Sequence, residues 1–272
     1  MTTRLWVLAF ACLTCATSVV MAAPKSGKPA TKGEIAQLAI TLDGIDDEAA
    51  AKAAIALGES TDPAAHEALL DALALGLRAS VAYDALGALA KHPAPPDVAS
   101  LQRYASHHNV KVRGVALATL ALYPDPAAHK LVVQGLHDPI GAVREAAANA
   151  AAKGHVRIAI EPLFELLARG EEPAARALAA MADADLVRKL GDHLGKVPDA
   201  SLALCMGLVL RRPEFGPDSE RVEVVRAIAK IQDQAAVNAL TDYIDATPKN
   251  PPRASRSEAE KIVEARLAGG GK

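Results

Sequence analysis

Aromatic residues are scarce in this chain of 272 residues. They make up 3% of it, whereas hydrophobic residues make up 51%. Alanine supplies much of the apolar content, and small side chains let helices approach near the short end of the usual range, about 8 Å. The net charge is −2, without the basic excess typical of a nucleic-acid-binding protein. The composition therefore indicates closely packed helices and argues against a nucleic-acid partner.

Cysteine is scarce as well. Of the three cysteines, Cys12 and Cys15 lie in an N-terminal segment expected to be removed, which leaves Cys205 alone. A single cysteine cannot form an intramolecular disulfide, so the remaining chain must be held together by packing. Cys205 lies in the apolar run 202–210. We expect it to be a buried small hydrophobic side chain and not a reactive thiol.

The chain lacks the alternation of apolar and polar residues that is typical of strands. Instead, a pattern recurs after Arg113, Arg144 and Arg221, with apolar or small residues at the third, fourth, seventh and usually tenth following positions. These positions hold Ala116, Leu117, Leu120 and Tyr123, then Ala147, Ala148, Ala151 and Gly154, and finally Val224, Val225, Ile228 and Ile231. The spacing is that of one stripe along an α-helix. A period of roughly thirty residues is typical of stacked helix pairs.

The ends of these helices are marked by residues that cap helices. Asp62-Pro63, Asp125-Pro126 and Asp138-Pro139 each place an Asp cap before a Pro at the first helical position, where Pro loses no needed hydrogen bond. The expected helices cover 33–43, 47–58, 63–75, 78–91, 95–106, 110–122, 126–136, 140–153, 157–169, 172–182, 184–195, 199–211, 219–231, 234–246 and 256–268. The predicted fold is all-α: a right-handed α-solenoid (α-α superhelix) of about seven antiparallel helix pairs, each an outer helix followed by an inner one.

The sequence divides into four parts. Residues 1–22 read as a secretory signal, with Arg4 before an apolar stretch and small or tolerable residues before a cut. Residues 23–32 form a flexible tether, 33–246 the solenoid, and 247–272 a Pro-rich linker and terminal helix with a Gly-rich tail. We expect export, most readily to a bacterial periplasm, with no membrane span after cleavage. An uncleaved N-terminal anchor in the inner membrane is the alternative.

The stretch from Asp138 to Ala148 resembles a HEAT repeat, specifically the short HEAT-like type also found in phycobilisome lyases. In that family an Asp six residues before the Val-Arg arginine forms a ladder between adjacent repeats, and Asp138 and Arg144 match those two positions. Residues 220–233 resemble the same inner helix with its terminating turn. The resemblance covers about 33–246 and implies an α-solenoid, but this fold serves many unrelated tasks.

Residues that could carry chemistry have simpler interpretations. His107-His108 lacks the spacing of metal ligands on a helix, and we expect neither a metal nor a cofactor. His66-Glu67 resembles a pair used by HEAT-like iron hydroxylases, but the dipeptide occurs once. The carboxylate pairs at 46–47 and 171–172 stand at helix starts, where the helix dipole favours them. No catalytic residue is nominated.

What remains is the surface of the inner helices. The repeat landmarks are Ala79, Arg113, Arg144 and Arg221. The fifth position after each should point away from the core, and there the chain has Asp84, Ala118, Asn149 and Arg226, with Lys153 and Lys230 at the ninth position. This polar column suits a protein contact, although an ordinary solvated face would have the same composition. The leading hypothesis is a non-catalytic exported scaffold or adaptor that binds a protein partner through its concave face. The alternatives are a divergent lyase- or hydroxylase-type enzyme, or a terminal helix that caps the last repeat.

Overall fold

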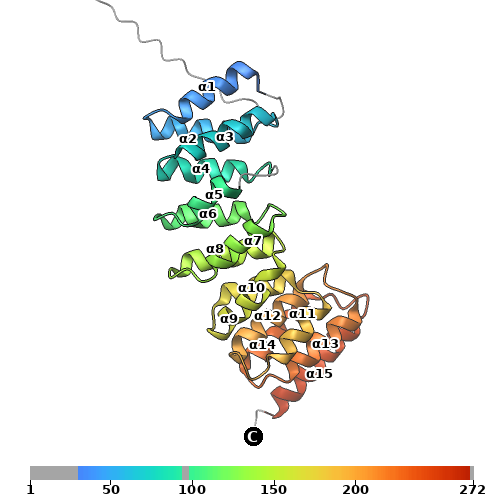
Figure 1. Cartoon of the computed structure of the whole chain (residues 1–272). Coiled ribbons are helices and arrows are strands. Elements are labelled where there is room, and N and C mark those ends of the chain that lie inside the picture. The colour runs from blue at the N-terminus through green and yellow to red at the C-terminus, as the bar shows by residue number, and fades with distance from the viewer. Residues whose placement is uncertain (1–29, 94–97, 270–272) are drawn as a thin grey trace, which may run out of the picture.

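The computed structural model describes residues 30–93 and 98–269. The predicted signal at 1–22, most of the tether and the last three residues of the Gly-rich tail lie outside this part. Within it, fifteen α-helices and one short 3-10 helix follow one another with no strand. The prediction of an all-α solenoid is confirmed, and the helices stack into an elongated array (Figure 1).

The helices form two layers. The even-helix layer contains α2 (Asp47–Gly58), α4 (Ala79–Leu89), α6 (Val110–Leu120), α8 (Gly141–Lys153), α10 (Glu172–Met181), α12 (Asp199–Arg211) and α14 (Gln234–Ala246). Each of these helices contacts the next one in the layer. The odd-numbered helices are α1 (Lys32–Leu42), α3 (Pro63–Leu75), α5 (Val98–Ala105), α7 (Pro126–Gly135), α9 (Ile160–Ala168), α11 (Ala184–Asp192), α13 (Asp218–Ala229) and α15 (Ala254–Gly269), with the 3-10 turn η1 (Arg157–Ala159) before α9.

The predicted stripes form the core. All four residues after Arg113 and all four after Arg221 are buried, as are Ala147, Ala148 and Ala151. The even helices pack closely because small residues meet between them. A Cβ added to Gly58 would lie 2.6 Å from that of Ala88, and one added to Gly207 would lie 2.9 Å from that of Ala239. Glycine is therefore required at both contacts.

One part of the sequence interpretation is wrong. The helix that follows Arg221 was expected to be an inner helix equivalent to those of Arg113 and Arg144. It is α13, which packs against α11 and α15, whereas α12 and α14 continue the layer of α6 and α8. The three arginines share a different role, because each donates to main-chain carbonyls that precede its own helix in the sequence. The acceptors are His107 and His108 for Arg113, Asp138 and Pro139 for Arg144, and Leu210, Arg212 and Pro213 at the end of α12 for Arg221. The motif marks this capping contact and not membership of a layer.

Two arginines of the even-helix layer also join adjacent repeats. Arg113 donates from Nε and Nη2 to the two carboxylate oxygens of Asp138, at 2.8 and 3.1 Å. Arg144 donates from Nε to Glu171 at 3.0 Å. Asp138 and Arg144 therefore belong to two consecutive ion pairs between repeats, Arg113–Asp138 and Arg144–Glu171. The direct hydrogen bond between them joins Arg144 Nη1 to the Asp138 main-chain oxygen, at 2.9 Å.

The terminal helix belongs to the packed body. It contacts α13 and α14, and its Arg266 donates to the carbonyls of Ala229 and Ile231 at the end of α13. Ser255 is buried and bonds to Asp218 and to Tyr243. Helix packing thus continues past residue 246, where the sequence placed the end of the solenoid. Across 30–93 and 98–269, no helix is both long and apolar enough to span a bilayer.

Ala147→Asp tests the register of α8. Ala147 is fully buried, so the new carboxylate would lie uncompensated in the core and should lower the free energy of unfolding by about 3–5 kcal/mol. Ala142→Asp is the control, because Ala142 is exposed in the first turn of the same helix, where a carboxylate is tolerated. Urea unfolding followed by circular dichroism measures both. An Ala147→Asp midpoint equal to that of the wild type would contradict the register.

Arg113→Gln tests the contact between repeats. The side chains of Arg113 and Asp138 are only 12% and 13% exposed, so loss of the cation leaves a mostly buried carboxylate unpaired. We expect the free energy of unfolding to fall by about 2–4 kcal/mol. In Arg176→Gln, which removes the ion pairs of a 42%-exposed arginine with Glu145 and Glu172, the change should stay below about 1 kcal/mol. Equal losses in the two variants would show that the Arg113–Asp138 pair has no special structural role.

Candidate partner-binding surface

The even-helix layer leaves one face of each of its helices to solvent, and we call this surface the even-helix face. In α4 the residues outside the buried stripe include Tyr83 and Asp84, and in α8 they include Asn149 and Lys153. Tyr83, Asn149 and Lys153 are exposed, whereas Asp84 is half-buried. Three of the residues predicted to bind a partner thus lie on two helices of one layer, with half-buried Ala118 on α6 between them.

A groove crosses this face over α4, α6 and α8. Its volume is about 870 Å³. Its lining is mostly small or apolar: Ala79, Ser80, Tyr83, Asn109, Val110, Lys111, Val112, Gly114, Val115, Ala118, Ala142 and Ala146. Tyr83 is 46% exposed, which leaves part of an aromatic ring open to a ligand. A groove of this composition suits an apolar segment that can approach the helix backbones closely.

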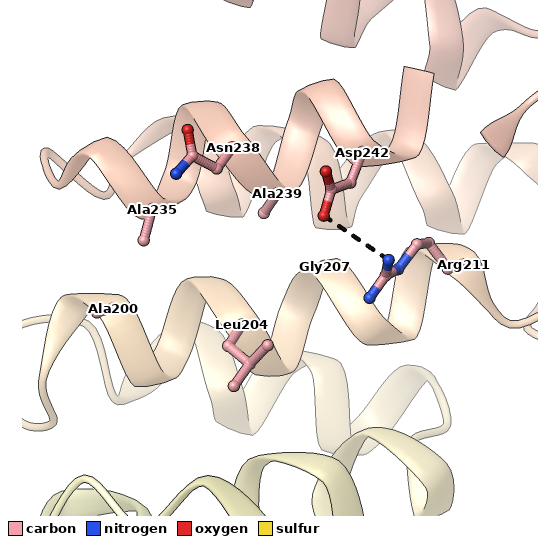
Figure 2. A pocket seen from close by; sticks show the side chains of 8 residues that line it. All are labelled: Ala200, Leu204, Gly207, Arg211, Ala235, Asn238, Ala239 and Asp242. Atoms are coloured by element: carbon pink, nitrogen blue, oxygen red, sulfur yellow. Dashed lines mark ion pairs between the residues drawn. The ribbon is translucent and has the colours of Figure 1, made fainter. Parts of the chain in front are cut away.

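A second, smaller hollow lies farther along the same layer, between α12 and α14 (Figure 2). Its volume is about 160 Å³, and Leu204, Gly207 and Ala239 are among the residues that line it. At one end Arg211 and Asp242 form an ion pair with a separation of 3.7 Å (Figure 2). The side chains of both are well exposed, so this pair remains available to solvent or to a polar ligand.

Among the charged side chains near the larger groove, Asp47 and Glu145 have ion-pair partners and Lys111 has none among the described residues. At the start of α2, Asp47 accepts hydrogen bonds from Ser80, at 2.8 Å, and from Arg78. These bonds, that of Ser80 first, hold the pKa of the Asp47 carboxyl below its usual value. Glu145 of α8 faces Arg176 at 3.4 Å. Lys111, in contrast, has no ion-pair partner within the described residues.

The expectation that Arg226 and Lys230 share a surface with Asn149 and Lys153 is wrong. Both residues belong to α13 and its C-cap, in the other layer. Arg226 is also engaged, because it pairs with Glu223 at 3.1 Å and with Glu258 of α15 at 3.3 Å. The error follows from the assignment of α13 to the inner helices, since the fifth and ninth positions after a landmark point away from the core in either layer.

The residues considered for chemistry have structural surroundings. Cys205 is fully buried, and its burial raises the pKa of the thiol to about 12. Burial, followed by the charges of His108 and Arg113, lowers the pKa of His107, and its Nδ1 accepts a hydrogen bond from the Asn109 main chain at 3.0 Å. Across 30–93 and 98–269, His, Cys, Asp and Glu form no group of three that would suit a metal ion.

The carboxylates that the sequence places at helix starts form hydrogen bonds or ion pairs there. Asp46 accepts hydrogen bonds from the main-chain nitrogens of Glu48 and Ala49 and so caps α2. Glu171 forms an ion pair with Arg144. His66, the other candidate, is half-buried on α3, and its pKa is lowered first by burial and then by the charge of His92.

Sequence reasoning missed Tyr83, Lys111 and Val115. It followed one column of positions, the fifth after each landmark, whereas the groove runs across several turns of three helices. One signal was present: Tyr83 is one of only four tyrosines and stands outside the apolar stripe of α4. An aromatic residue placed outward in a chain with few aromatics is a candidate for a contact.

Residues 98–184 match a family model described as HEAT repeats. No curated protein matches the chain. Among solved structures, a chain of the complex of CpcE and CpcF of phycocyanin lyase from Nostoc sp. PCC7120 is 19% identical, with a TM-score of 0.46 over 89% of this chain and 97% of that chain. An engineered protein is 22% identical, with a TM-score of 0.33 over 87% and 97%. The predicted resemblance to HEAT repeats is thus confirmed for residues 98–184.

Proposed function

We propose that the protein is a non-catalytic scaffold or adaptor that binds a protein partner through its even-helix face. The observation that carries the proposal is the groove over α4, α6 and α8, which combines an apolar lining with a half-exposed tyrosine. Tyrosine is enriched at protein interfaces because its ring supplies contact area and its hydroxyl a hydrogen bond. The polar residues Asp84, Asn149 and Lys153 would form part of the rim around this centre.

A protein suits this groove better than a nucleic acid does. One lysine is the single charged residue among those that line it, and the whole chain has a net charge of −2. Nucleic-acid binding draws most of its affinity from several lysines or arginines on phosphates. A mostly apolar groove with a polar rim is the arrangement typical of protein interfaces.

The absence of catalysis is part of the same proposal. It is supported by the roles of the residues that would have to react: Asp46 caps a helix, Glu171 joins two repeats and Cys205 is enclosed in the core. A divergent lyase- or hydroxylase-type enzyme would need a bound chromophore or metal ion. Absorption spectroscopy and metal analysis of the purified protein distinguish the two functions.

We further propose that the protein is exported to a bacterial periplasm and that the segment 1–22 is removed. Support comes from the sequence of that segment, in which one arginine precedes an apolar stretch. N-terminal sequencing of the protein from its native host should give a chain that begins at Ala23 or Pro24. A chain that retains Met1 in a soluble cytoplasmic fraction would contradict export, and one that retains Met1 in the inner membrane would support the anchored alternative.

Tyr83→Ala tests the binding surface. If Tyr83 lies at the centre of the interface, its loss should weaken binding of the partner about 30-fold, which corresponds to about 2 kcal/mol. Stability should change by no more than about 0.5 kcal/mol, because the side chain is half-exposed. The partner is obtained by affinity purification from envelope extracts, and its dissociation constant is then measured by calorimetry.

The matched control is Leu267→Ala. Leu267 is also an exposed hydrophobic residue, with 67% of its surface open, but it lies on α15, away from the even-helix face. Its substitution should leave the dissociation constant unchanged. If Tyr83→Ala binds as tightly as the wild type, or if both variants lose affinity equally, the partner does not bind through the groove at Tyr83.

A further inference from the structure

We infer that the segment bound in the groove over α4, α6 and α8 is an apolar stretch of the partner that carries a carboxylate. The inference rests on the proposed function and goes beyond it, because it states the chemistry of the partner. Two features of the groove specify the bound segment: the size of the side chains on its floor and the sign of its single charge.

The floor requires an apolar segment that comes close to the helices. Gly114, Ala118, Ala142 and Ala146 line the groove, and none of them projects beyond a methyl group. A bound backbone can therefore approach α6 and α8 without displacing a side chain. Such close approach leaves no room for the hydration shell of polar groups, so the residues that face the floor must be apolar.

The positive charge of Lys111 in the groove calls for a carboxylate on the bound segment. Lys111 is the single charged residue among those that line the groove, and no carboxylate lines it. Three nearby acidic residues have ion-pair partners of their own: Asp47 with Arg78, Asp138 with Arg113 and Glu145 with Arg176. The Lys111 ammonium is thus a cation without a counterion from its own chain, so far as the described residues go. An acidic group on the bound segment supplies one.

Asp84 provides a charge of opposite sign at a neighbouring position. It follows Tyr83 on α4 but is not among the residues that line the groove, and it has no ion-pair partner among the described side chains. An acidic segment in the groove would be attracted by Lys111 and repelled by Asp84. The two residues therefore form a matched pair for mutation, with opposite expected effects.

The bound segment can be identified by photo-cross-linking from the groove. Benzoylphenylalanine replaces Tyr83 in the full chain in its native host, and the adduct is digested and sequenced. We expect a partner segment rich in apolar residues with an Asp or Glu within about one helical turn of the cross-linked position. A cross-linked segment that is basic, or that carries no acidic residue, would overturn the inference.

The charge is then tested with that segment as a synthetic peptide. Lys111→Gln should weaken its binding about threefold at low salt, whereas Asp84→Asn should strengthen it. The loss in Lys111→Gln should shrink at about 0.5 M salt. The screening length there lies between the value of about 10 Å at 0.1 M and that of about 3 Å at 1 M, so the attraction between the ammonium and a carboxylate is weaker. Equal affinities of Lys111→Gln and wild type at low salt would overturn the inference.

A second cross-linking position separates this inference from the proposed function. Benzoylphenylalanine at Leu204 probes the smaller hollow of the same layer, lined by Leu204 and Ala239. Adducts from position 204 without adducts from position 83 would refute the groove as the binding site of the segment and leave the even-helix face as the binding surface. No adduct from either position would refute the proposed function together with the inference.

Discussion

The burial of apolar helix stripes against neighbouring helices is the interaction on which the rest of this structure depends. Each stripe is narrow and several are rich in alanine, so one helix pair encloses too little apolar area to be stable alone. Stacking solves this problem only if the helices come close together. Gly58 against Ala88 and Gly207 against Ala239 (Figure 2) show how the even-helix layer achieves such contacts. The scarcity of large aromatic residues and the layered architecture are therefore two aspects of one constraint.

Stacked helices create many helix ends, and their carbonyl groups need hydrogen-bond donors. Arginine supplies these donors in both layers. Arg212 donates to the carbonyls of Ala179 and Ala182 at the end of α10, and Arg256 donates to those of Ile244 and Thr247 at the end of α14. Arg113 donates to carbonyls of the loop before α6 and also forms its ion pair with Asp138. A guanidinium group suits the task because its five N–H donors can satisfy several acceptors at once.

The same physics explains what the sequence could and could not predict. The helices and their buried stripes follow from local periodicity, and the residues after Arg113 and Arg221 are buried as expected. The layer of α13 does not follow from it, because a capping arginine and an apolar stripe are needed in either layer. The groove is harder still to predict, since it depends on which small residues of three separate helices lie side by side. Periodicity describes one helix at a time, whereas a surface belongs to several.

In such an architecture the outward-facing residues of a helix can change largely independently of the residues that form its buried stripe. In α8, Ala147 and Ala148 face the core while Glu145 and Asn149 are exposed, so a change on the outward side leaves the packing of the stripe intact. Outward residues can therefore be selected for contact with a partner at little cost in stability. Lys111 has this freedom, because it has no ion-pair partner among the described residues. Arg113, two residues later, is fixed by its contacts with Asp138 and His107. The short sequence between Lys111 and Arg113 thus separates a residue available for recognition from one required for the fold.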